Sequence, residues 1–139
     1  MRRATLGLFA LAAFGCSVEK EGAEPYPSHI VDSVDTGLEA FALESGGAIV
    51  LLGQDSNSTW RLQAWTPGEL SLAREVELGG GAGVGLLVEG NTAYVGLRRS
   101  DSTGSILSVD ISTGELSELS FSLPGRWRSF AKVGDEFVL

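Results

Sequence analysis

The sequence has few of the residues that most often build catalytic and metal sites. Its 139 residues include one cysteine, Cys16, and one histidine, His29. No disulfide can form within the chain, and no metal site is expected, least of all a zinc or copper site. Basic residues are also scarce, at 10 against 18 acidic ones, which argues against nucleic acid as a partner. Burial of apolar surface must therefore supply the stability of the domain.

The sequence also lacks an apolar run long enough to cross a membrane. The charge-free segment 4–14 is much shorter than the roughly 20 residues that a spanning helix needs. It follows Arg2 and Arg3 and ends at Gly15, which is the layout of a secretory signal. The charged residues that follow Cys16 argue against a buried core thiol at that position.

The residues Ala13-Phe14-Gly15-Cys16 resemble the lipobox of bacterial lipoprotein signals, with Ala13 where leucine is more common. The resemblance covers only the first sixteen residues. It implies that residues 1–15 are a signal peptide, and that Cys16 is lipidated and holds the exported protein on a bacterial membrane. Ser17 after the cysteine implies the outer membrane, at its periplasmic or surface face. Cleavage by the ordinary signal peptidase, after Ala12 or Gly15, is the alternative and also predicts export.

The segment 16–30 is predicted to be a flexible tether, because it is charged and broken by Pro25 and Pro27. Loss of Arg2 and Arg3 with the signal would leave eight basic and 18 acidic residues, a net charge of −10. Residues 31–139 then form one small domain.

This domain is predicted to be all-β, because apolar residues recur with a period of two and Gly, Asn, Asp and Ser punctuate them. Leu107, Val109 and Ile111 alternate with polar residues, which predicts a strand with one apolar and one polar face. Residues 60–64 show the same alternation of apolar and polar residues. After the turn at 66–69, one apolar face is expected to carry Leu70, Leu72, Val76 and Leu78.

A second pattern in the sequence is the constant spacing of three glycines. Gly46, Gly90 and Gly134 each separate two predicted strands and lie 44 residues apart. A period of 40–45 residues with four strands is typical of a β-propeller blade. Blades are predicted at 38–78 and 83–123, with a third beginning near Trp127.

The segment 91–115, which contains Ala93-Tyr94-Val95 and Ser108-Val109-Asp110-Ile111-Ser112-Thr113-Gly114-Glu115, resembles YVTN and quinoprotein-like propeller repeats. The resemblance implies a partial β-propeller-like domain. Propellers usually close with four to eight blades, whereas two blades and the start of a third are predicted in this sequence. We therefore expect the sequence to be a truncated part of a longer propeller. Ring closure by oligomerisation and an open sheet stack are the alternatives.

Few segments point to chemistry. The glycine-rich run 79–85 has neither a dinucleotide nor a P-loop pattern, and it is predicted to be the crossing between blades. Loops 55–59 and 101–104 have oxygen ligands for Ca²⁺ but no closing glutamate, so plain polar turns are expected. Asp32 and Asp35 form a candidate carboxylate pair, although nothing places a substrate beside them.

Trp127 and His29 are two further residues of types that occur in binding and catalytic sites. Trp127, between Arg126 and Arg128, is expected to be a buried blade aromatic rather than a stacking platform. His29 is expected to be a solvated loop residue.

These observations favour a non-catalytic binding or scaffold module with no cofactor. Its predicted partners are the membrane, through Cys16, and a protein of the cell envelope. The alternatives are a fragment of a quinoprotein- or lactonase-like propeller enzyme, and a remnant without function.

Overall fold

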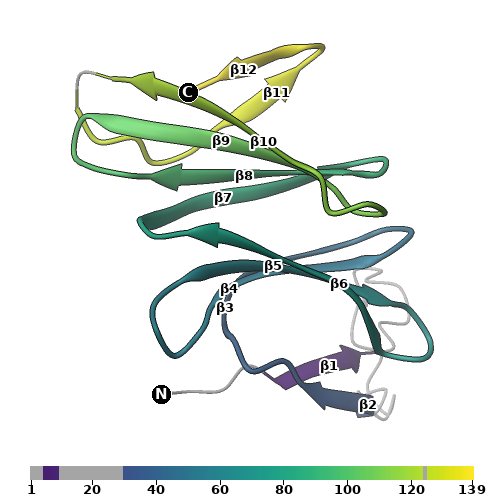
Figure 1. Cartoon of the computed structure of the whole chain (residues 1–139). Helices are drawn as coiled ribbons and strands as arrows, with labels where there is room; N and C mark the ends of the chain where they lie inside the picture. The colour runs from purple at the N-terminus through teal and green to yellow at the C-terminus, as the bar shows by residue number, and fades with distance from the viewer. Residues whose placement is uncertain (1–4, 10–29, 124) are drawn as a thin grey trace, which may run out of the picture.

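Every regular element in the described part of the chain is a β-strand, which confirms the all-β prediction (Figure 1). The computed structural model describes residues 5–9, 30–123 and 125–139, with side chains from residue 34 onward. The strands are β1 (Thr5–Phe9), β2 (Ile30–Asp35), β3 (Glu39–Ser45), β4 (Ile49–Gln54), β5 (Trp60–Thr66), β6 (Ser71–Gly79), β7 (Ala82–Glu89), β8 (Thr92–Arg98), β9 (Thr103–Asp110), β10 (Leu116–Ser122), β11 (Ala131–Val133) and β12 (Glu136–Val138).

Eight of these strands form two antiparallel four-stranded sheets, each an open meander. Sheet I has the order β3-β4-β5-β6, and sheet II has the order β7-β8-β9-β10. Gly46, Gly90 and Gly134 lie in the turns after the first strand of each copy, as their spacing predicts. The two sheets lie at the positions predicted for blades one and two.

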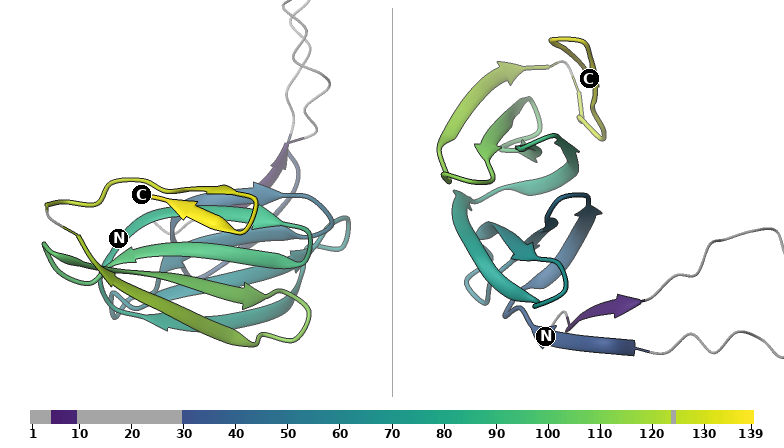
Figure 2. Two further views of the ribbon diagram at one scale, coloured as in Figure 1. Left: turned by 90° about the horizontal axis from the view of Figure 1, so that it is seen from above. Right: turned by 90° about the vertical axis from the view of Figure 1, so that its right-hand side faces the viewer.

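The main core lies between the two sheets, which stack face to face in all the views (Figure 2). Alternate residues of neighbouring strands point into this layer because side chains of a strand alternate between its faces. The buried members are Val50, Leu52, Trp60, Leu62 and Leu78 from sheet I and Ala93, Val95, Leu97, Leu107 and Val109 from sheet II.

Glycine lets the two sheets approach closely at one point. A β-carbon on Gly83 of β7 would lie 2.5 Å from the ring of Trp60, so only glycine fits there. Trp60 Nε1 donates a hydrogen bond of 2.9 Å to the carbonyl of Gly81, which ties the ring to the crossing between the sheets.

The crossing between the sheets is shorter than the predicted segment 79–85, so that prediction is wrong in extent. Only residues 80–81 lie between strands, and the later glycines belong to β7.

The prediction that Leu70 and Leu72 share a face with Val76 and Leu78 is also wrong. The β5–β6 register shifts between Ala64 and Trp65, and such an irregularity moves side chains to the other face of the sheet. Leu72 pairs with Trp65 and is largely exposed, whereas Leu70 is buried in a separate cluster with Ile49 and Trp65.

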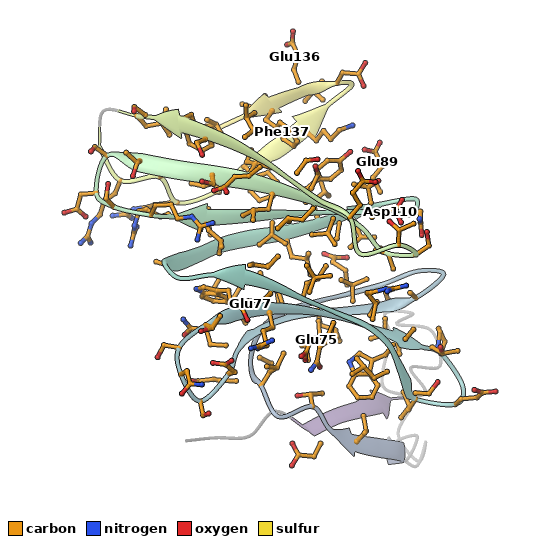
Figure 3. The ribbon with its side chains drawn as sticks, in the orientation of Figure 1. Glu75, Glu77, Glu89, Asp110, Glu136 and Phe137 are labelled. Carbon is orange, nitrogen blue, oxygen red and sulfur yellow. The ribbon has the colours of Figure 1, made fainter. Side chains whose placement is uncertain are left out.

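The hairpin β11–β12 lies on the side of sheet II that faces away from sheet I, and it is the start of the predicted third copy. Its aromatic residues hold it there. Phe137 packs edge-on to Tyr94 of β8, with ring centroids 5.4 Å apart. In Figure 3, Phe137 lies between the hairpin and sheet II, whereas Glu136 points away from them.

At the other end of the molecule, β1 pairs with β2 in a separate two-stranded antiparallel sheet. The sequence predicts no strand at 5–9, which lies inside the predicted signal peptide. Val34 of β2 packs against the cluster of Ile49, Trp65 and Leu70 on sheet I. No helix in the described residues is long and apolar enough to cross a membrane.

Candidate binding surface

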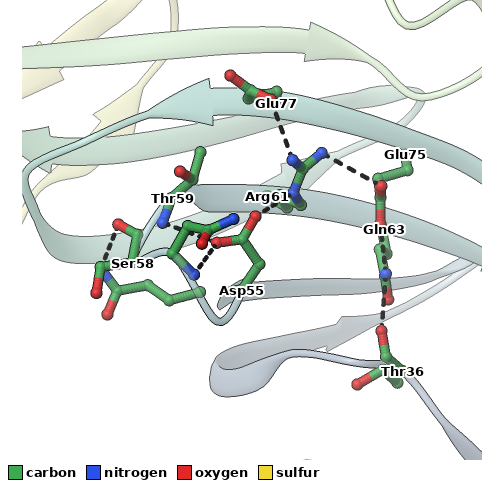
Figure 4. Close-up of polar contacts among 10 residues, drawn as sticks. Thr36, Asp55, Ser58, Thr59, Arg61, Gln63, Glu75 and Glu77 are labelled. Carbon is green, nitrogen blue, oxygen red and sulfur yellow. Dashed lines mark hydrogen bonds and ion pairs between the residues drawn. The ribbon is translucent and has the colours of Figure 1, made fainter.

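The polar side chains of sheet I form a network on its outer face, which is the face turned away from sheet II (Figure 4). Arg61 is its centre. The Nε atom of Arg61 donates to Asp55 Oδ2 at 2.8 Å, and its two Nη atoms reach Glu75 at 3.4 Å and Glu77 at 3.1 Å. Gln63 continues the network by donating to the Thr36 carbonyl at 3.0 Å.

Asp55 holds the turn between β4 and β5. Its Oδ1 accepts from the backbone amides of Asn57 at 2.8 Å and Thr59 at 3.1 Å. The hydrogen bond from Arg61, followed by that from Thr59, lowers the pKa of Asp55, and the same pair raises the pKa of Arg61. The prediction of a plain polar turn at 55–59 fits this geometry, because the carboxylate is engaged by groups of its own turn and by Arg61.

Asp110 organises the turn between β9 and β10 of sheet II. Its Oδ1 accepts from the Ser112 hydroxyl at 2.6 Å, the Thr113 amide at 2.8 Å and the Asn91 side chain at 3.0 Å. The hydrogen bonds from the Ser112 hydroxyl, first, and from the Thr113 amide lower the pKa of Asp110 to about 2. A carboxylate with this many donors from its own turn is a structural group and is poorly suited to act as a general base near neutral pH.

Arg99 links the end of sheet I to sheet II. It donates to the carbonyl oxygens of Gly80 and of Leu78, the latter at 3.2 Å, and to Glu118 at 3.2 Å. A hydrogen bond from Ser105 and the bond from Arg99 lower the pKa of Glu118. The cation thus satisfies carbonyl groups where the chain crosses between sheets.

A groove of about 430 Å³ opens between the β3–β4 turn and the β7–β8 turn. Val50, Val88 and Ile111 line it, and Glu44 is the one charged residue among its described lining residues. Asn91, at its rim, already donates to Asp110 at 3.0 Å and to Ser112 at 2.9 Å. The groove therefore offers a single exposed carboxylate to a ligand.

The outer face of sheet II, turned away from sheet I, is the second large surface. We define it by Tyr94, Gly96, Arg98, Gly104, Ile106, Ser108, Leu119 and Phe121, whose register places them on one side of the sheet. Trp127, Phe130 and Phe137 cover one part of it, and Lys132 of the hairpin donates to Glu89 at 2.7 Å. Leu119 remains 56% exposed.

The residues singled out in the sequence take separate places. Trp127 is buried between flanking exposed arginines, as predicted, and its ring packs on Phe121 with centroids 4.9 Å apart. Arg126 pairs with Asp101 at 3.5 Å on the surface. Cys16 and His29 lie outside the described residues.

The candidate pair of carboxylates is described only in part. Asp32 lies in β2, where its side chain is not described, and Asp35 accepts a hydrogen bond of 2.9 Å from the Gly37 amide. Among the described residues, no group of three or more His, Cys, Asp or Glu side chains is placed to hold a metal ion. The outer face of sheet II was missed in the sequence, where alternation assigned β9 a purely polar second face.

Comparison with protein-family models, curated proteins and solved structures finds no match for this chain.

Proposed function

We propose that this chain is a non-catalytic binding or scaffold module of a bacterial cell envelope, exported and held on the membrane by lipid on Cys16. We further propose that sheets I and II are blades of a β-propeller-like repeat. The 44-residue spacing of the three turns and the four-stranded meander in each full copy support the repeat. The basic start, the apolar segment 4–14 and the position of Cys16 support the anchor.

The observation that carries the binding function is the outer face of sheet II. Apart from Arg98 and Ser108 its residues are mostly apolar, and Leu119 is exposed beside buried Ile106 and the half-buried ring of Phe121. Exposed apolar patches framed by polar residues are typical of protein–protein contacts. Asp55, Asp110 and Arg99, by contrast, are engaged in turns and in the crossing between the sheets.

The anchor is tested by mass spectrometry of the native protein extracted with detergent from membranes of its host. We expect an N-terminal peptide that begins at Cys16 and carries acyl chains. Two or more chains would give stable attachment, since one chain binds membranes only marginally. A Cys16→Ala variant should leave the membrane fraction, and an unmodified Cys16 in the native protein would contradict the anchor.

The binding function is tested separately, by crosslinking in living cells with a photoreactive residue at position 119 and a control residue at position 56 in the exposed β4–β5 turn. We expect a covalent protein adduct from position 119 and none from position 56. Absence of any protein adduct from position 119 would refute a binding module at this surface.

A further inference from the structure

One lysine of the chain shows how an aliphatic ammonium group is held where two layers of strands meet. Lys132 of β11 reaches sheet II, where its Nζ atom donates to Glu89 Oε2 at 2.7 Å. Its Nζ atom also donates to the Gly134 carbonyl at 2.6 Å and lies 5.5 Å from the centre of the Tyr94 ring. Only 13% of the Lys132 side chain is exposed. A carboxylate, a turn carbonyl and an aromatic ring therefore hold this cation.

Val88 has the place of Lys132 in the contact between sheets I and II. The two residues are 44 positions apart, as are their partners in the hairpins, Ala93 and Phe137. Both side chains face the preceding sheet, since Val88 packs on the core between sheets I and II. Valine is shorter than lysine and has no ammonium group. At this position the structure has the groove of about 430 Å³, with Val88 in its lining.

The groove has a carboxylate, as the contact with Lys132 does. Glu44 pairs with Val50, and this register places Glu44 on the face of sheet I that is turned toward sheet II. Glu89 likewise lies at the end of the first strand of its sheet and faces the next layer. Glu44 is exposed, and no lysine or arginine is among the described residues that line the groove. The carboxylate is thus offered to a cation from outside the groove.

The remaining lining suits an alkyl chain. The apolar side chains in it are those of Ala48, Val50, Val88 and Ile111. The rim has a second negative charge close by, because Asn91 at the rim donates to Asp110 at 3.0 Å. A volume of about 430 Å³ is typical of sites for small organic molecules. An apolar lining with negative charge at its rim is complementary to an aliphatic cation.

We propose that the groove between the β3–β4 turn and the β7–β8 turn binds a small aliphatic primary amine. The ammonium group pairs with Glu44, and the alkyl chain packs on Val50 and Val88. The amine thus supplies the group that Lys132 supplies in the next contact along the chain. The groove opens between two turns, so a free amine can enter it from solvent. This site is separate from the outer face of sheet II, and it goes beyond the proposed function because neither requires the other.

The test is a titration of the isotope-labelled full chain with n-pentylamine at constant pH, followed by nuclear magnetic resonance of the main-chain amides. We expect saturable shifts confined to the groove, at Gly46, Gly47 and Asn91. The expected Kd is about 1 mM, an affinity that is reasonable for so small a ligand. n-Pentanol has the same chain without the charge and should bind about threefold more weakly or worse. Added salt should weaken binding of the amine more than that of the alcohol.

Glu44→Gln removes the negative charge with little change in size. It should weaken binding of n-pentylamine by about three- to fivefold, the effect of one exposed ion pair. Glu39→Gln is the matched control, because Glu39 is an exposed glutamate at the other end of the same strand, β3. It should leave the affinity unchanged.

Val88→Lys gives the first contact the lysine of the second. Its side chain should fill the groove, pair with Glu44 and abolish binding of the amine. The amide spectrum of each variant shows whether it is folded. If Val88→Lys does not fold, Val88→Met takes its place, since an unbranched apolar chain should also occupy the groove and weaken binding.

Four results would overturn the proposal. Three of them are the absence of saturable shifts with n-pentylamine, equal weakening by the variants at positions 39 and 44, and binding of n-pentanol as tight as that of the amine. The fourth is binding of a lysine capped at both main-chain ends without binding of n-pentylamine, because the occupant would then be a lysine of a partner protein.

Discussion

The two faces of sheet II are built from the same strands but are protected to different degrees. Ala93, Val95 and Leu97 of β8 point toward sheet I and are completely buried. Tyr94 and Gly96, between them in the sequence, point toward the hairpin β11–β12, which covers only part of that face. Alternation decides the face on which a residue lies, but the neighbouring layer decides whether that residue is protected from water.

The largest expected effect compares a leucine from each face. Leu107→Ala should lower the free energy of unfolding by about 2–5 kcal/mol, because it leaves a cavity between the two sheets. Leu119→Ala should change it by about 0.5 kcal/mol or less, since Leu119 is mostly exposed. Urea denaturation of the two variants measures both values, and equal losses would show that the outer face is as well packed as the inner one.

A second comparison adds a methyl group to a glycine on each face. Gly83→Ala should destabilise the protein by about 1–3 kcal/mol, because its β-carbon would lie 2.5 Å from the Trp60 ring. In Gly96→Ala, the added β-carbon would lie 2.8 Å from the ring of Trp127 and 2.9 Å from that of Phe130. We expect a smaller loss of stability than for Gly83→Ala, because these two rings belong to the segment just before β11 and can shift with it.

Gly47→Ala is the control, because a β-carbon there has no atom within 4 Å. Its midpoint in thermal unfolding should remain close to that of the wild type. A Gly96→Ala variant less stable than Gly83→Ala would mean that the hairpin is held more rigidly than the sheet I–sheet II interface.

The turn at Asp110 predicts a pH dependence. Its pKa is lowered from 3.8 to about 2 in the folded chain, so its contribution is present above the pKa of the unfolded state. That contribution should be lost as the pH falls from about 4 toward 2. Asp110→Asn should flatten this part of the stability profile in acid denaturation, and a slope identical to that of the wild type would contradict the assignment.

The smallest effect is expected at the N-terminus. Removal of residues 1–15 takes away β1, which pairs with β2 in a two-stranded sheet of the kind that is marginally stable by itself. The free energy of unfolding should change by less than about 1 kcal/mol. A larger loss in calorimetry would show that β1 is part of the folded domain, which would argue against its removal as a signal.

The sequence predicts the repeated parts of the fold better than their irregularities. The alternation around Leu107 and the spacing of the three glycines place both four-stranded sheets correctly. The side on which Leu72 lies could not be predicted, because it depends on a register shift opposite Trp65. Burial of Ile106 was also missed, since β9 is covered on both faces and a strand covered twice does not show simple alternation.

The sequence predicts less of the candidate surface than of the fold. Burial of Trp127 was predicted, but its place on Gly104 and Gly96 depends on contacts between segments more than twenty residues apart. The lipid on Cys16 remains a prediction from the sequence.

The most direct test of the account is the reactivity of a cysteine placed at position 119, measured both in native membranes and in the purified protein. We expect Leu119→Cys to react with a maleimide reagent after purification and to be protected in membranes, where a partner covers the outer face of sheet II. Ser56→Cys, in an exposed turn, should react in both. Equal reactivity of position 119 in the two preparations would contradict the central claim that this face is a binding surface.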